Sequence, residues 1–157
     1  MSDSTPVQTA EHQITITRVF DAPRELVFKA WTDPDHLARW FGPTGFETPR
    51  ESVEIDLRAG GRIHLRMVQG GSGMEYRLRY EIVELVEPEL LVLRHEPMPE
   101  VGLHNSTVTR VELQEEAGKT RMTLTDGPYT EEGGGGASAG WEASFDKLEA
   151  MLGGSAA

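Results

Sequence analysis

The most regular hydrophobic pattern in the chain lies near its C-terminus. Trp141, Phe145, Leu148 and Leu152 recur at i, i+4, i+7 and i+11, with charged residues between them. This spacing places the four apolar side chains on one face of a helix and predicts a helix over about residues 136–152. An apolar stripe must be buried, and most of the remaining chain has the pattern of strands. We therefore expect the helix to lie on one face of an antiparallel sheet.

Alternation of apolar and polar residues predicts seven strands. They cover residues 14–20, 52–57, 62–68, 74–85, 90–95, 105–113 and 119–126, and turn-forming residues separate most of them. In the third and fourth of these strands the alternation assigns the faces. Ile63, Leu65 and Met67 share one face with Tyr80 and its in-phase neighbours, and the other face is charged.

Two short helices are predicted between the first and second strands. Pro23 suits the start of one, while Asp33 and Pro34 suit the N-cap and first turn of the other, which Gly42 ends. The order strand, two helices, six strands and helix indicates an α+β fold with helices on one face of a curved antiparallel sheet. We expect one domain over residues 13–153, with flexible tails at 1–12 and 154–157.

Composition narrows the classes of partner. The formal charge of −11 disfavours nucleic acid and anionic membranes, and the second short helix offers Asp35, His36 and Arg39 rather than a set of base-reading side chains. The scattered histidines and the lack of cysteine predict no metal site and no cofactor. Without cysteine or a secretory signal pattern, we expect a cytoplasmic protein.

Several segments resemble the START-like (SRPBCC, Bet v 1-like) superfamily, and most of all the bacterial relatives of the activator of the heat-shock chaperone ATPase. They are FDAPRELVF at 20–28, AWTDPDHLARWFGP at 30–43, DLRAGGR at 56–62, and Gly140 with Trp141 and Leu148. The resemblance implies a helix-grip fold, in which a long C-terminal helix crosses a curved seven-stranded sheet. It also implies a cavity for an apolar or amphipathic ligand between helix and sheet, and it carries over no shared catalytic set.

Residues 131–140, EEGGGGASAG, depart from the usual pattern of these relatives. Each glycine inside a helix costs about 1 kcal/mol relative to alanine, so we expect the first turns to unravel into a loop. Such a loop would lie beside the mouth of the cavity. It would act there either as a lid or as a plain connector.

The candidate ligand-binding residues are those expected on the inner surface. His95 is in phase with Leu91 and Leu93, and it is either a ligand-orienting group, a general base or a hydrogen-bonded histidine at a strand end. The alternation predicts no acid or arginine on this surface, which leaves Tyr76, Tyr80 and two threonines as its other polar groups. The full set is Trp40, Phe46, Leu65, Met67, Tyr76, Leu78, Tyr80, Leu93, His95, Thr107, Thr109, Met122, Trp141 and Phe145.

Three functions remain open from the sequence. The leading one is non-enzymatic binding of a small hydrophobic or aromatic ligand in the cavity. The resemblance supplies two alternatives: a co-chaperone that acts on a heat-shock chaperone ATPase, and a small cyclase like the polyketide aromatases. The last requires an acid–base pair, for which only His95 with Tyr76 or Tyr80 is available. Monomer and homodimer are equally open.

Overall fold

The computed structural model describes residues 12–99 and 105–153. One antiparallel sheet has the strand order β1-β8-β7-β6-β5-β4-β2, and β3 pairs with β4. The strands are β1 (His12–Phe20), β2 (Phe46–Glu47), β3 (Glu54–Asp56), β4 (Arg62–Gln69), β5 (Glu75–Val86), β6 (Leu90–His95), β7 (Thr107–Glu116) and β8 (Lys119–Tyr129). The helices are α1 (Arg24–Thr32), α2 (Pro34–Trp40) and α3 (Glu131–Gly153), and a 3-10 turn covers Arg50–Ser52.

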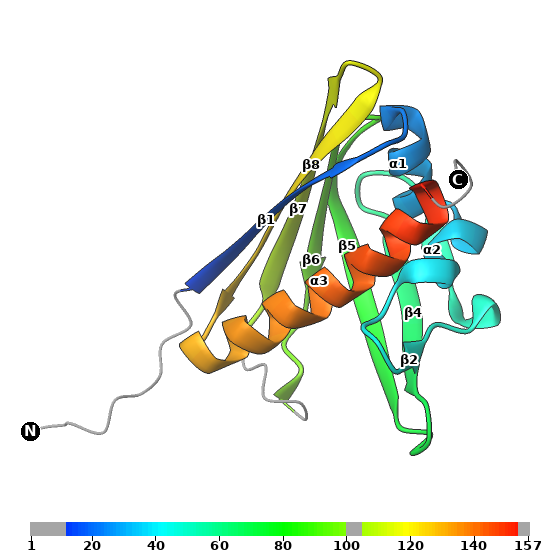
Figure 1. Ribbon diagram of the computed structural model, residues 1–157. Helices are drawn as coiled ribbons and strands as arrows, with labels where there is room; N and C mark the ends of the chain where they lie inside the picture. The colour runs from blue at the N-terminus through cyan, green and yellow to red at the C-terminus, as the bar shows by residue number, and fades with distance from the viewer. Residues whose placement is uncertain (1–11, 100–104, 154–157) are drawn as a thin grey trace, which may run out of the picture.

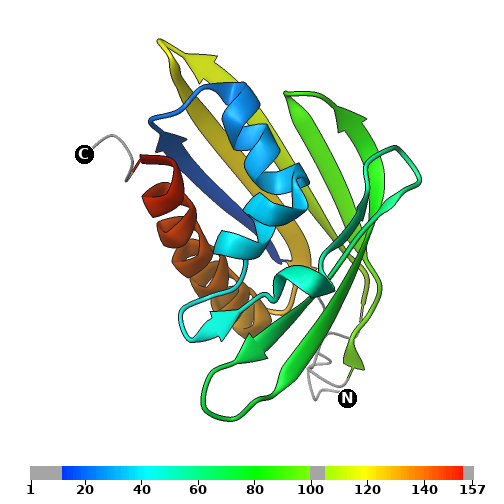
Figure 2. The same ribbon diagram turned by 90° about the vertical axis from the view of Figure 1, so that its right-hand side faces the viewer.

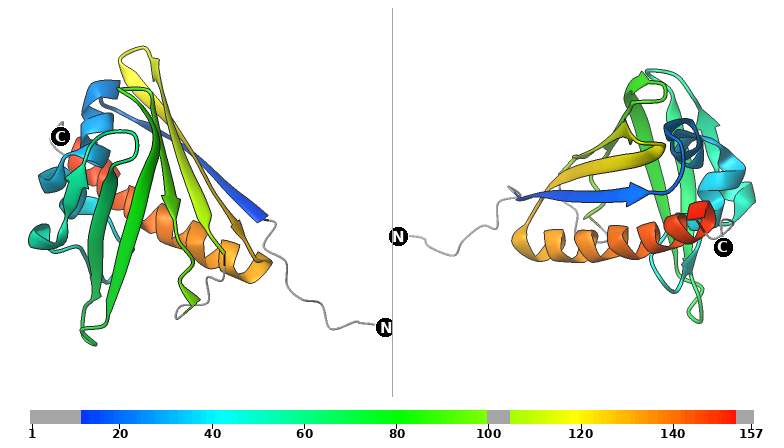
Figure 3. Two further views of the ribbon diagram at one scale, coloured as in Figure 1. Left: turned by 180° about the vertical axis from the view of Figure 1, so that it is seen from behind. Right: turned by 45° about the horizontal axis from the view of Figure 1, so that its top comes forward.

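The sheet is curved, and α3 runs across its concave side (Figures 1 and 3). The short helices α1 and α2 lie near the C-terminal end of α3 and close that end of the space between helix and sheet (Figures 1 and 2). This arrangement confirms the predicted α+β helix-grip fold. The sheet has eight strands rather than seven, because the two-residue β2 pairs with the end of β4.

The predicted faces of β4 and β5 are confirmed by the register between them. Ile63 lies opposite Tyr80 and Leu65 opposite Leu78 on the inner face. Successive side chains point to opposite sides of a strand. Arg62 and the residues that follow it at every second position therefore point outward. The alternation in the sequence therefore sets which residues face the space under α3.

The start of α2 also follows the sequence. The Asp33 carboxylate accepts hydrogen bonds from the backbone N–H groups of Asp35 (2.9 Å) and His36 (3.3 Å), and Pro34 occupies the first turn. These bonds satisfy donors that a helix N-terminus otherwise leaves unpaired. Gly42 follows the helix with a φ of 112°, a backbone conformation that favours glycine.

The start of α3 corrects the prediction for residues 131–140, which are helical rather than a loop. The Thr130 hydroxyl accepts a hydrogen bond from the Gly133 N–H (3.0 Å), and the Thr130 carbonyl accepts one from Gly134 (2.7 Å). A Cβ at Gly134 would lie 3.7 Å from the Tyr129 Cβ, so the helix starts close to the end of β8. Capping and tertiary contact thus outweigh the low helix propensity of glycine. The lid and connector hypotheses both assumed a loop here.

A close-packed aromatic core fills the space under the C-terminal half of α3. Trp31 and Trp40 meet edge to face with ring centroids 4.8 Å apart, and the Phe145 ring lies 6.2 Å from Trp31 and 6.1 Å from Trp40. The Trp40 indole N–H donates to the carbonyl of Ala30 at 2.9 Å. Together with Leu148, these rings are almost completely buried. They fix α3 against α1 and α2.

Ion pairs hold the outer side of the same helix to β1. The Arg18 guanidinium lies 2.8 Å from Glu142, 2.9 Å from Asp146 and 3.6 Å from Glu149. The two shorter contacts are hydrogen bonds to the two carboxylates, and they raise the pKa of Arg18 against the opposing effect of its partial burial. This cluster ties about two turns of α3 to the edge strand of the sheet.

Candidate functional site

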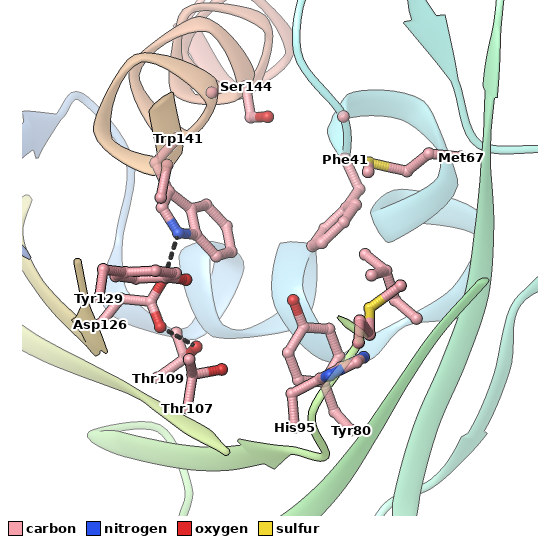
Figure 4. Close-up of a pocket in the computed structure, with 15 residues that line it drawn as sticks. Phe41, Met67, Tyr80, His95, Thr107, Thr109, Asp126, Tyr129, Trp141 and Ser144 are labelled. Carbon is pink, nitrogen blue, oxygen red and sulfur yellow. Dashed lines mark hydrogen bonds between the residues drawn. The ribbon is translucent and has the colours of Figure 1, made fainter. Parts of the chain in front are cut away.

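The concave side of the sheet is hollow beneath the N-terminal half of α3. The cavity there has a volume of about 180 Å³ (Figure 4). Its walls come from α3, from the segment after α2, and from the inner faces of strands β4 to β8. The fifteen lining residues are Phe41, Gly42, Met67, Leu78, Tyr80, His95, Met98, Thr107, Thr109, Asp126, Tyr129, Ala137, Gly140, Trp141 and Ser144.

Small side chains on α3 account for this space. Ala137, Gly140 and Ser144 follow one another at i, i+3 and i+7, so they form a stripe that faces the cavity beside Trp141. A Cβ added at Gly140 would have no atom within 4 Å. Elsewhere along the helix, larger side chains fill the space between α3 and the sheet. These three small residues leave that space open.

Asp126 is the most unusual residue of the cavity wall, because it is an acidic residue that is only 1% exposed. Its Oδ1 accepts a hydrogen bond from the Thr109 hydroxyl at 2.8 Å. Its Oδ2 accepts from the Tyr129 hydroxyl at 2.6 Å and from the Trp141 indole N–H at 2.8 Å (Figure 4). The carboxylate thereby links β7, β8 and α3. All three donors are neutral groups.

Two tyrosines respond to this buried charge. Burial raises the pKa of the Tyr129 hydroxyl, and the charge of Asp126 and the hydrogen bond to it raise that pKa further. Burial also raises the pKa of Tyr80, with a smaller contribution from Asp126. The Tyr80 hydroxyl points into the cavity and has no hydrogen-bond partner among residues 12–99 and 105–153 (Figure 4). It is therefore a polar group that a bound molecule can reach.

His95 lines the cavity but has no free ring nitrogen. Nε2 accepts a hydrogen bond from the Arg79 backbone N–H at 3.1 Å, so Nδ1 carries the proton and donates to the Glu96 carbonyl at 2.6 Å. A general base needs an available lone pair, and the only one on this imidazole is engaged. Of the three roles expected from the sequence, the hydrogen-bonded histidine at a strand end matches this geometry.

The structure separates the predicted ligand-binding residues into three groups. Those that line the cavity are Met67, Leu78, Tyr80, His95, Thr107, Thr109 and Trp141. Those buried in the close-packed core, away from the cavity wall, are Trp40, Leu65, Leu93, Met122 and Phe145. Phe46 and Tyr76 pack on each other with ring centroids 5.8 Å apart, outside the cavity lining. Contact of any of these residues with a ligand stays a prediction.

The expectation that the inner surface carries no acid was wrong. Asp126 continues the period-two phase of Met122 and Leu124, both fully buried, and this phase was the signal that could have placed its carboxylate inward. Tyr129 and the small residues of α3 were also missed. Gly140 and Ser144 are four residues apart, a spacing that places them next to each other on one face of a helix.

Two further observations concern metal ligands and membrane-spanning helices. Within residues 12–99 and 105–153, no three His, Asp or Glu side chains are grouped closely enough to hold a metal ion. In the same part of the chain, no helix has the length and apolar character needed to cross a bilayer.

A long helix across a curved antiparallel sheet, with a cavity between them, defines a helix-grip protein of the SRPBCC (Bet v 1-like) class. The chain belongs to the Activator of Hsp90 ATPase homolog 1-like protein family, whose model matches residues 21–153. This confirms the family indicated by the sequence segments. Among curated proteins, none matches the chain.

Solved structures of similar proteins share the fold. Protein CV1439 from Chromobacterium violaceum is 26% identical, with a TM-score of 0.80 over 89% of this chain and 96% of that protein. Protein NE0264 from Nitrosomonas europaea is 22% identical, with a TM-score of 0.76 over 89% and 93% of the two chains. The AHSA1 protein from Silicibacter pomeroyi is 22% identical, with a TM-score of 0.75 over 90% and 97%. These likenesses support the architecture and identify no ligand.

Proposed function

We propose that this protein binds one small, mostly apolar molecule in the cavity between α3 and the sheet. The observation that carries the proposal is the hollow of about 180 Å³ next to a close-packed core in the same layer. An apolar cavity of about 150 Å³ is large enough for benzene. A single ring with a short substituent therefore matches the available volume.

The character of the walls supports an amphipathic ligand. Phe41, Met67 and Leu78 contribute apolar surface to the lining, and Tyr80 and Asp126 contribute polar groups. Figure 4 shows Tyr80 and Asp126 on different sides of the cavity. Ligand sites are usually largely apolar, with a few polar groups that fix orientation. A ligand with its polar group near Tyr80 would satisfy the hydroxyl that has no partner among the described residues.

The test combines retained mass with stability. Native mass spectrometry of the purified protein, compared with its denatured mass, should show an additional small molecule that is lost on denaturation. Small ring compounds added to the ligand-free protein should raise its stability by RT ln(1 + [L]/Kd), which is about 2.7 kcal/mol at a concentration 100 times Kd.

A pair of variants ties the effect to the cavity. Gly140→Leu places a side chain in the open space, and Gly136→Leu places the same side chain on the exposed face of the same helix. Stabilisation by the ring compounds should disappear in the first variant and persist in the second. Equal stabilisation of both variants by the ring compounds would overturn the proposal. So would a wild-type protein that retains no additional mass and is not stabilised by any of these compounds.

The two alternatives have less support from the geometry. A co-chaperone function is favoured by the family description alone, and it predicts that the protein stimulates the ATPase of a heat-shock chaperone in a direct assay. The cyclase alternative relied on His95 as its base, and both ring nitrogens of His95 are held by backbone groups.

A further inference from the structure

We propose that the ligand carries a protonated amine beside its ring and that the Asp126 carboxylate is the counter-ion. This inference rests on the proposed function, because it assumes a ligand in the cavity and assigns its chemical class. It makes Asp126 the residue that determines specificity. Three observations lead to it.

The first observation is the set of hydrogen bonds around Asp126. The Trp141 indole N–H can only donate, and the hydroxyls of Thr109 and Tyr129 lie at 2.8 and 2.6 Å in positions to donate as well. An ionised carboxylate accepts all three bonds without a proton of its own to place. The surrounding groups therefore suit a negative charge, yet each is neutral and leaves that charge uncompensated.

The second observation is the lack of a protein cation at this position. None of the fifteen lining residues is lysine or arginine, and no ion pair to Asp126 is formed within the described ranges 12–99 and 105–153. A buried charge is costly unless it is paired. The cavity is the side of the carboxylate on which a ligand cation can supply that partner, and a ligand anion would be repelled there.

The third observation is the number of acceptors that face the cavity. A carboxylate has about four acceptor positions, and three of those of Asp126 are taken by Thr109, Tyr129 and Trp141. About one position is left for a ligand donor. The Tyr80 and Thr107 hydroxyls line the same cavity (Figure 4). An alkylammonium group carries three N–H donors, so Asp126, Tyr80 and Thr107 match it in number. The aromatic face of Trp141 adds a surface that attracts cations.

The experiment compares four molecules that share one phenyl ring and differ in the end group. They are 2-phenylethylamine, 2-phenylethanol, propylbenzene and phenylacetate, each titrated into the wild-type protein at pH 7 by calorimetry. We expect the amine to bind at least ten times more tightly than propylbenzene, the alcohol to lie between them, and phenylacetate to bind most weakly.

The outcomes distinguish this inference from the proposed function. Equal binding of the amine and propylbenzene, or tighter binding of phenylacetate, would overturn the assignment of Asp126 while leaving a ligand-binding cavity in place. If none of the four bound, the proposed function and this inference would both fail for ligands of this size.

A variant assigns the preference to one residue. Asp126→Asn removes the charge at nearly constant volume, and it should abolish the preference for the amine while propylbenzene still binds. Asp21→Asn removes the same charge from an exposed position and should leave the preference intact. An amine preference that survived in folded Asp126→Asn would overturn the proposal, and the wild-type series decides the question if that variant does not fold.

Discussion

The two halves of α3 lie on the same sheet but meet it in different ways. Toward the C-terminus, Phe145 and Leu148 fill the space against Trp31 and Trp40, and these side chains are almost fully buried. Toward the N-terminus, Ala137, Gly140 and Ser144 face a cavity instead. The helix axis is common to both halves. The core forms where Trp31 and Trp40 reach large side chains of α3, and the cavity lies where α3 presents small ones.

The two halves are also attached to the sheet by different forces. The filled half is held by apolar packing and by the ion pairs of Arg18 with Asp146 and Glu149. The hollow half is held by the hydrogen bond from Trp141 to the buried carboxylate of Asp126, and by the packing of the Trp141 ring on Phe41 and Phe145. Because the filled half removes more apolar side-chain surface from water, we expect it to contribute the larger share of the stability.

The largest expected effect comes from opening the filled half. Phe145→Ala should lower the free energy of unfolding by about 3–5 kcal/mol, because it leaves a void among rings that cannot collapse. Ser144→Ala, at the adjacent position facing the cavity, should change it by less than about 1 kcal/mol. Urea denaturation measures both. Similar losses in the two variants would show that the halves do not differ as described.

The next effect comes from removing the anchor of the hollow half. Asp126→Ala leaves the Thr109, Tyr129 and Trp141 donors without an acceptor and should cost about 3 kcal/mol. Thr109→Val tests the energetic coupling between Thr109 and Asp126. The variant with both substitutions should lose less free energy of unfolding than the two single variants together. Strict additivity in this cycle would mean that the hydrogen bond from Thr109 contributes nothing.

A smaller, opposite effect is expected at the start of α3. Gly135 and Gly136 are exposed helical positions where an added Cβ meets nothing, so replacing either by alanine should stabilise the protein by about 1 kcal/mol. Gly61→Ala is the contrasting change, because a Cβ there would meet the carbonyl oxygen of Asp56. Thermal unfolding measures all three. No gain at positions 135 and 136 would indicate that these turns are not helical in solution.

The smallest effect concerns alkaline pH. Burial and the charge of Asp126 raise the pKa of Tyr80 and Tyr129 in the folded state, whereas an unfolded tyrosine ionises near pH 10. The unfolded state then loses protons first, so stability falls as pH rises through that value. At pH 10 each tyrosine should cost the folded state about 0.4 kcal/mol. Absorbance at 295 nm should show both phenols ionising only on unfolding, and ionisation of either one in the folded protein would contradict this.

Local signals in the sequence predicted most of the fold. The alternation of β4 and β5 gave the correct inner face, and Asp33 with Pro34 gave the correct start of α2. These features depend on near neighbours in the chain. The start of α3 was missed because summed glycine penalties take no account of the Thr130 cap or of the contact with β8. The two-residue β2 is too short to show any alternation.

The candidate site was less predictable, because periodicity gives the direction of a side chain and not the distance to the opposite wall. Leu65 and Leu78 share a face and pair across strands, yet only Leu78 lines the cavity. Asp126 had the correct phase, but a carboxylate is usually exposed, and its donors come from three separate elements. Such a cluster becomes visible only when the fold brings its members together.

The small residues on the cavity side of α3 have a consequence for evolution. Exchanging Ala137, Gly140 or Ser144 for larger or smaller side chains would change the volume offered to a ligand, while Phe145 and Leu148 continued to hold the helix in place. The volume of the cavity and the stability of the fold are thus set at different positions of one helix. Proteins such as those from Chromobacterium violaceum and Nitrosomonas europaea share this architecture at 26% and 22% identity.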